Sequence, residues 1–242
     1  MVSRKLLAIG VLAAFPLWLS AQPTVGQLCG TVVDESGTGV KAALVVASGA
    51  GFQGWATSED DGSFCVQRAG AFISARHAGF NPIVKRTSEL GRNQIRIELV
   101  RADSSVKTLT SCQSLPDGGR GWIGRGLRVK PPRGRYKGPV QGEHDTHWYV
   151  RFGKQTLHIV DGYAWHAGLP FEGLLSESAS IEVRGWEFGD TVGLDLSGQL
   201  SDGRRWRWVG APLADAVSYE SAAPDEAEFF DRVLDSVCFG MR

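Results

Sequence analysis

Short apolar stretches separated by tight-turn signals run from residue 28 to residue 100, and they limit the possible fold more than any other feature of this sequence. Asp61-Gly62 is a strong hairpin signal between two such stretches, because both residues tolerate a positive φ. The expected strands lie at 28–34, 42–47, 63–66, 70–75 and 94–100. No helical stretch interrupts them, so we expect this part of the chain to form a β-sandwich.

The composition indicates a globular, β-rich protein. Its 31 glycines in 242 residues are about twice the ~7% average, and a hydrophobic fraction of 43% excludes an intrinsically disordered chain. Lysine plus arginine and aspartate plus glutamate number 26 each, which gives a formal net charge of zero. A chain without an overall positive field is not expected to bind nucleic acid. The length suits one large domain or two small ones.

Residues 1–21 have the features of a cleaved signal peptide. Arg4 and Lys5 precede an apolar run at 6–19, and Ala21 is the small residue that a signal peptidase requires at its cut. A retained membrane anchor is the alternative, but a run of about 14 residues is shorter than the ~20 of a membrane span. We therefore expect an exported protein, periplasmic or secreted, with no transmembrane segment after cleavage.

The chain has four cysteines, Cys29, Cys65, Cys112 and Cys238, and all of them follow the predicted cleavage site. An even number in an oxidising compartment predicts two disulfides, for which three pairings are possible. The spacing contains no Cys-x-x-Cys pair, which argues against a structural zinc site or a thioredoxin-like redox motif.

A series of glycines and apolar residues in the first part of the chain follows the order found in a known family. The residues are Gly30-Thr-Val-Val-Asp34, Gly37, Gly39-Val40, Ala43, Val45, Thr57, Asp61-Gly62-x-Phe64, Gly70-x-Phe72 and Gly79-Phe80. Residues 25–103 thereby resemble the carboxypeptidase regulatory-like domain, a transthyretin-like sandwich. The resemblance implies an accessory, non-catalytic domain with a carbohydrate-binding-like fold. It also implies the pairing of Cys29 with Cys65 and, with it, of Cys112 with Cys238.

The alternation ends in small polar residues at 101–105, where we expect a boundary between a first domain at 22–103 and a second at 104–242. The second segment resembles no known family. It is rich in tryptophan and is expected to be mostly β, with strands at 148–152, 156–160, 180–183, 192–196 and 204–209. One helix is expected at 224–239, because Pro224 favours a helix start and apolar residues follow at helical spacing up to Gly240.

Charge is segregated within the second segment. Seven basic residues at 120–137 are unaccompanied by any acid, and they are Arg120, Arg125, Arg128, Lys130, Arg133, Arg135 and Lys137. Residues 215–235 carry seven acids and only Arg232. The basic stretch is interpreted as a loop that contacts an anionic partner or, alternatively, as a solvated loop that meets the protein's own acidic helix.

Four of the five histidines, His144, His147, His158 and His166, fall within 23 residues. Neutral imidazoles are zinc ligands, so a metal-dependent hydrolase is one hypothesis for this cluster. The spacing differs from the His-Glu-x-x-His helix of zinc peptidases, and the preferred interpretation is surface or hydrogen-bonded histidines without a cofactor.

Trp206 and Trp208 alternate with arginines, so both rings are expected on one face of a strand. An exposed face would stack sugar rings, with Tyr163 and Trp165 as further contributors, whereas a buried face would be core. No Gly-x-Ser-x-Gly elbow or other catalytic motif is present in the sequence. The expected function is therefore non-catalytic binding or scaffolding at the cell envelope, with an envelope glycan or another envelope protein as partner. Carbohydrate recognition through exposed tryptophans is the first alternative, and hydrolysis at the histidine cluster is the second.

Overall fold

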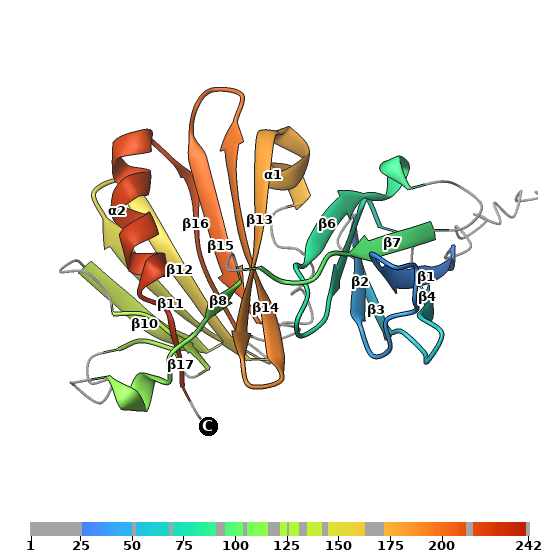
Figure 1. Ribbon diagram of the computed structural model, residues 1–242. Helices are drawn as coiled ribbons and strands as arrows, with labels where there is room; N and C mark the ends of the chain where they lie inside the picture. Colours follow the sequence, from blue (N-terminus) through green and yellow to red (C-terminus); the bar gives the residue numbers. More distant parts are fainter. Residues whose placement is uncertain are drawn as a thin grey trace, which may run out of the picture.

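The structure is a computed structural model. It describes residues 26–49, 52–67, 70–90, 95–103, 106–115, 122–124, 126–130, 135–141, 145–162, 172–211 and 215–240. The predicted signal peptide lies outside the described residues. The prediction of a mainly β protein with a C-terminal helix is confirmed (Figure 1).

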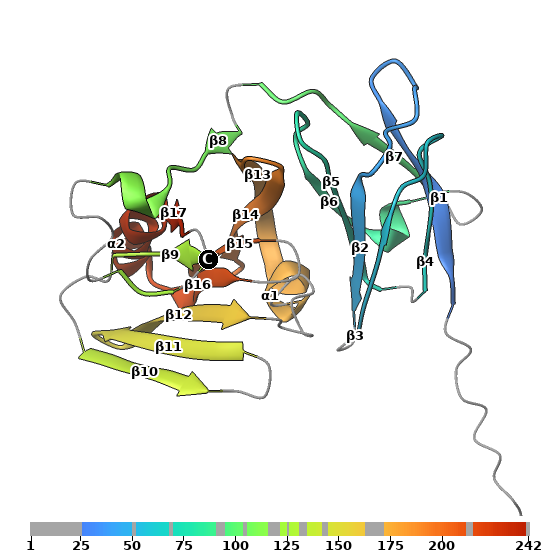
Figure 2. The same ribbon diagram turned by 90° about the horizontal axis from the view of Figure 1, so that it is seen from below.

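Two sheets built from the first hundred residues enclose a common apolar core (Figures 1 and 2). One has the strand order β4 (Ser63–Val66), β1 (Leu28–Asp34), β7 (Ile95–Leu99). The other has the order β3 (Phe52–Thr57), β2 (Leu44–Gly49), β5 (Phe72–Arg76), β6 (Ile83–Arg86), and a 3-10 turn, η1 (Thr87–Glu89), follows. The alternation of apolar and polar residues along β7 matches their burial: Ile95, Ile97 and Leu99 are buried, and the residues between them are exposed.

The Asp61-Gly62 turn lies where the sequence predicted it, just before β4. Gly62 has a φ of +82°, which glycine adopts without steric cost. A Cβ at this position would come within 2.1 Å of the Val32 carbonyl oxygen. The glycine therefore meets two requirements, the backbone conformation and the close approach to β1.

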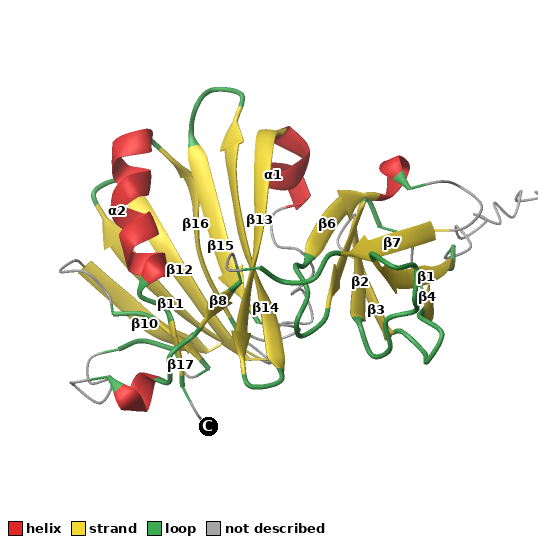
Figure 3. Cartoon of the chain, in the orientation of Figure 1, coloured by secondary structure: helices red, strands yellow, loops and turns green. Residues whose placement is uncertain are grey.

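An eight-stranded sheet forms most of the remaining chain. Its order is β10 (Arg135–Gln141), β11 (Asp145–Phe152), β12 (Gln155–Gly162), β16 (Ala216–Ala222), β15 (Arg205–Gly210), β14 (Thr191–Leu200), β13 (Ser178–Phe188), β8 (Lys107–Thr108). A small second sheet pairs β9 (Leu127–Arg128) with β17 (Cys238–Phe239), and the helical elements are η2 (Cys112–Ser114), α1 (Glu172–Glu177) and α2 (Pro224–Asp235). Helix α2 lies across one face of the large sheet, and α1 lies beside β13 (Figure 3).

Helix α2 begins at the predicted residue, Pro224, but the predicted end at 239 and the predicted stop at Gly240 are wrong. The helix ends at Asp235, and Cys238–Phe239 forms strand β17 against β9. Pairing with a distant strand holds this backbone extended, although its side chains continue the helical apolar pattern.

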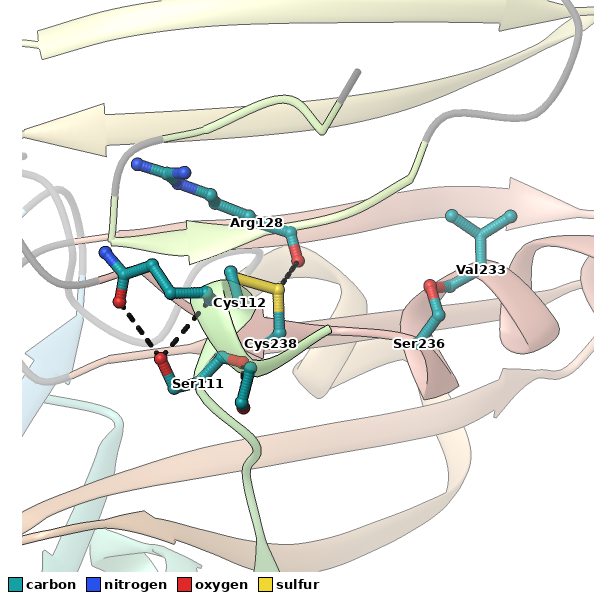
Figure 4. The surroundings of a disulfide bond; sticks show 8 residues. Ser111, Cys112, Arg128, Val233, Ser236 and Cys238 are labelled. Atoms are coloured by element: carbon teal, nitrogen blue, oxygen red, sulfur yellow. Dashed lines mark hydrogen bonds between the residues drawn. A yellow bond between two sulfur atoms is a disulfide. The ribbon is translucent and has the colours of Figure 1, made fainter. Parts of the chain in front are cut away.

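Both disulfides join the cysteines that the family resemblance implied. Cys29 and Cys65 lie opposite each other at one register position of β1 and β4. Cys112 in η2 is bonded to Cys238 in β17, 126 residues further along the chain (Figure 4). The second bridge therefore fixes the segment after α2 to the segment that enters the large sheet.

The four-stranded sheet and the large sheet share an apolar cluster. Phe72 of β5 is buried in the same cluster as Leu175 of α1 and Trp206 of β15. A polar contact joins the same two parts, since the Gly79 N–H donates a hydrogen bond of 2.9 Å to Glu187 Oε1. The outer face of β5 is thus an internal surface of the protein.

Arg76 lies on that face of β5, two positions along the strand from Ser74 and four from Phe72. Its side chain is buried, and its Nε and Nη1 atoms have no hydrogen-bond partner among the described residues. Burial lowers the pKa of this guanidinium to about 10, so the group remains charged at neutral pH. A buried charge without a partner is a cost to the folded state.

We expect the substitution Arg76→Met to raise the free energy of unfolding by about 1–3 kcal/mol, because it removes the unpaired charge and keeps an apolar side chain of similar length. Urea-unfolding midpoints of the two proteins measure this difference. Arg86→Met is the matched control on the next strand. The Arg86 guanidinium is exposed, lies 5.8 Å from the centroid of the Phe72 ring and donates to the Ser176 carbonyl, so its loss is expected to lower stability by less than about 1 kcal/mol. A lower stability of Arg76→Met than of the unchanged protein would contradict the prediction.

Candidate functional site

Trp206 and Trp208 do not form the exposed platform that carbohydrate recognition through these rings requires. They share one sheet face, as their alternation predicted, but they are 0% and 4% exposed and belong to an apolar cluster. The two rings pack closely over Gly198 and Gly210, and the Trp206 Nε1–H donates to Ser178 Oγ at 2.8 Å. The core interpretation of these tryptophans is therefore correct, because α1 and the leucines of β14 cover them. The other two predicted contributors, Tyr163 and Trp165, lie outside the described residues.

Two of the four clustered histidines lie together. His147 on β11 and His158 on β12 are on adjacent strands, and His147 Nδ1 is 2.9 Å from His158 Nε2, a hydrogen-bond distance. His144 and His166 lie outside the part of the chain whose side chains are described. Within the described residues, no three metal-binding side chains gather at one point.

Tyr149 joins the two histidines in a row of parallel rings on the same face of the sheet. The Tyr149 and His158 centroids are 4.7 Å apart with an angle of 3° between the planes. The His147 and His158 centroids are 5.2 Å apart with an angle of 10°. All three rings are half-buried, so each keeps part of its surface in contact with solvent. We refer to His147, Tyr149 and His158 as the ring row.

The turn after β11 produces this arrangement. Gly153, with a φ of +58°, and Lys154 connect Phe152 to Gln155, which pair across the hairpin. Counting back three pairs from this turn puts Tyr149 opposite His158. The expected strands at 148–152 and 156–160 with a turn at Gly153 already contained this pairing, and counting the register would have brought the two rings together.

A pocket of about 270 Å³ lies beside the ring row. Its lining consists of Tyr149, Lys154, Gln155, Thr156, His158, Ser218, Tyr219 and Glu220. These side chains present an ammonium group, an amide, hydroxyls, an imidazole and a carboxylate, so the pocket offers both hydrogen-bond donors and acceptors. Burial raises the pKa of the Glu220 carboxyl above its usual value. Of the lining residues, only His158 was a predicted site residue.

The opposite face of the sheet is held against α2 by a network of charges around Arg207. The Arg207 Nε and Nη2 atoms donate to the two carboxylate oxygens of Asp195 at 2.8 and 2.6 Å. Arg207 Nη1 lies 2.9 Å from Asp235 Oδ1, and the Tyr219 hydroxyl donates to Asp231 at 2.8 Å. Burial, reinforced by the hydrogen bond to Asp231, raises the pKa of Tyr219.

This network changes the interpretation of the acidic segment at 215–235. Among the described residues, the ion pairs that tie α2 to the sheet run from Asp231 and Asp235 to Arg205 and Arg207 of β15. Most of the basic stretch at 120–137 lies outside the residues whose side chains are described. Strand β15 supplies these partners, and the prediction that the basic stretch meets the acidic helix falls on residues outside the described part of the chain.

Comparison with known protein families, with curated proteins and with solved structures found no match to this chain. Among the residues that the structure describes, no helix has the length and apolar character needed to cross a membrane.

Proposed function

We propose that this chain is a non-catalytic, exported binding protein of the cell envelope, and that its ligand binds in the pocket beside Tyr149 and His158. The observation that supports this proposal is the composition of that pocket. Its lining combines the partly exposed aromatic ring of Tyr149 with several polar side chains. A concave site with converging polar groups is the usual form of a small-ligand site. Two disulfides fit the oxidising compartment into which an exported protein would pass.

A glycan is the ligand class that fits this lining best. A sugar carries several hydroxyl groups that both donate and accept hydrogen bonds, and it has a C–H face that packs on an aromatic ring. Tyr149 offers such a ring, and Gln155, Thr156 and Glu220 lie around it with amide, hydroxyl and carboxylate groups. The proposed carbohydrate site is thus not at the buried tryptophans of β15 but near the turn of the β11–β12 hairpin.

We expect full-length mature protein to bind at least one oligosaccharide on a glycan array that includes fragments of cell-envelope polysaccharides. The substitution Tyr149→Ala is expected to weaken binding about tenfold or more, because it removes the stacking surface. Gln155→Ala, at the edge of the same pocket, is expected to weaken binding about 3- to 10-fold through lost hydrogen bonds. Titration calorimetry with the tightest-binding oligosaccharide measures these ratios.

Trp55→Ala provides the matched control. Trp55 is 57% exposed on β3 of the first part of the chain, so a similar aromatic surface is removed far from the pocket in sequence. The Trp55→Ala variant is expected to bind the oligosaccharide with the same affinity as the wild type. Near-UV circular dichroism identifies any variant that fails to fold, and Gln155→Ala then remains informative because Gln155 packs in neither apolar cluster of the large sheet. Equal affinities of the wild type, Tyr149→Ala and Gln155→Ala would overturn the proposal.

A further inference from the structure

We infer that His147 and His158 form a binding site for one divalent transition-metal ion, and that Cu²⁺ binds there most tightly. This inference rests on the histidine pair itself and does not depend on a glycan ligand. It requires only two protein ligands, and the remaining coordination positions are left to water or another small ligand.

The two facing nitrogens are close enough to bind one ion together. His147 Nδ1 and His158 Nε2 are 2.9 Å apart. Two imidazole nitrogens at ~2.0–2.1 Å from one ion are about 2.9 Å apart when they occupy neighbouring corners of a square. The same bond lengths at a tetrahedral angle place them about 3.3–3.4 Å apart. The present distance is that of a hydrogen bond between the two rings and lies within about 0.5 Å of both values, so an ion needs little change in spacing to bind. Cu²⁺ is expected to bind most tightly, because sites built from imidazole nitrogens favour it over Ni²⁺ and Zn²⁺.

The scaffold around the two rings keeps them close without a metal. The histidines lie on neighbouring antiparallel strands, and the parallel Tyr149 ring flanks His158. Because two backbone strands fix both Cβ positions, little chain entropy is lost when the ion binds. Because the two nitrogens face each other across a hydrogen bond, both rings must turn about their side-chain torsions before their lone pairs meet at one ion.

The proton balance of the binding step is simple. In the hydrogen-bonded pair, one ring donates an N–H to the lone pair of the other. For the ion to bind, the donated proton leaves the shared position and the donor ring takes its other neutral tautomer, protonated at its second nitrogen. Both facing nitrogens then offer lone pairs to the ion, and no net proton is released when both rings are neutral.

The location of this site gives the ion an open side. His158 also lines the pocket described above, where Lys154 and Glu220 are the charged groups. An ion on the pair would therefore lie at the His158 side of this pocket, whose lining also includes the Glu220 carboxylate. A small anionic or hydroxyl-bearing ligand in the pocket could occupy one of its free coordination positions.

The test is a titration of the full mature chain with Cu²⁺ alone, followed by electron paramagnetic resonance and by competition with glycine. We expect one equivalent to bind with an axial spectrum and nitrogen coupling from two imidazoles. His147→Ala and His158→Ala are each expected to weaken that binding at least tenfold, and Zn²⁺ is expected to bind the wild type more weakly than Cu²⁺.

His77→Ala is the matched control, because His77 is the histidine of the first part of the chain and its interactions with the described residues are with the Ala78 carbonyl and the Phe80 ring of its own turn. It is expected to leave Cu²⁺ binding unchanged. Conservative His147→Gln and His158→Gln variants retain a polar side chain at each position and replace the alanine variants if those do not fold. If a folded variant with both His147 and His158 replaced bound Cu²⁺ as tightly as the wild type, the inference would be overturned. It would also be overturned if His77→Ala weakened Cu²⁺ binding as much as the His147 and His158 variants do. Because no glycan is present, the failure of glycan binding leaves this result unaffected.

Discussion

Replacing Cys112 and Cys238 together with serine is expected to lower the free energy of unfolding by about 5 kcal/mol. The two cysteines are 126 residues apart, and in the chain-entropy model a cross-link over a loop of that length removes about this much free energy from the unfolded state. The bridge closes nearly the whole large sheet, and both cysteines are buried, 0% and 2% exposed. Equilibrium urea unfolding of the double variant measures the loss.

The other disulfide provides the comparison for this prediction. Cys29 and Cys65 are 36 residues apart, which corresponds to about 4 kcal/mol in the same model. The Cys29→Ser, Cys65→Ser double variant is therefore expected to be destabilised by about 1 kcal/mol less. The loss of stability in this variant is expected to be confined to the first part of the chain. Hydrogen exchange, measured residue by residue, shows where the stability is lost. A loss below about 1 kcal/mol in the Cys112→Ser, Cys238→Ser variant would contradict the structural role assigned to the longer bridge.

Arg207→Met is expected to lower the free energy of unfolding by about 3–5 kcal/mol. The Arg207 side chain is 9% exposed and its partner Asp195 is 14% exposed, so removal of the cation leaves a largely buried carboxylate without its partner. Asp231 loses its second cation at the same time, although Arg205 still lies 2.9 Å from it. Thermal and urea unfolding at neutral pH both report this change.

Arg184→Met separates this effect from a general loss of positive charge. Arg184 lies on the same sheet and forms an ion pair of 2.7 Å with Glu182, but both side chains are more than half exposed. Solvent screens such a pair, so the control is expected to lose less than about 1 kcal/mol. A further variant, Arg207→Met with Asp195→Leu, removes both charges and is expected to recover part of the stability. If Arg207→Met were no less stable than Arg184→Met, the network would not hold α2 on the sheet.

The first part of the fold was predictable because its signals are local. The Asp61-Gly62 turn, the alternation of 95–99 and the strand at 28–34 each depend on neighbours within a few residues. The disulfide pairs followed from the family resemblance and not from the spacing of the cysteines, which allowed three pairings.

The elements that the sequence did not predict depend on distant partners. Strand β16 reads Ala-Val-Ser-Tyr-Glu-Ser-Ala, which has little apolar alternation and falls within the acidic segment at 215–235. It is buried because Phe230 of α2 stacks on Tyr219 and because β12 and β15 flank it. Likewise, the end of α2 is set by the pairing of β17 with β9, which lies more than a hundred residues earlier.

The candidate site was predictable only in part. His147 and His158 were recognised as chemically notable, and the hairpin register that joins His158 to Tyr149 was implicit in the Gly153 turn. Ser218 and Glu220 reach the same pocket only because β16 pairs with β12, and that pairing has no signal in the local sequence. Residue type alone did not show that Trp206 and Trp208 are buried. Gly198 on the neighbouring strand and Gly210 further along β15 leave room for the two rings, and α1 covers them.

The most direct test of the central proposal is an NMR titration that follows the aromatic ring resonances of Tyr149, His158 and Trp55. The titrant is the tightest-binding oligosaccharide from the array, added to the full mature chain. The proposed pocket predicts saturable shifts of Tyr149 and His158, with Trp55 unchanged. Saturable shifts at Trp55 with Tyr149 and His158 unmoved would place the ligand elsewhere and contradict the proposal.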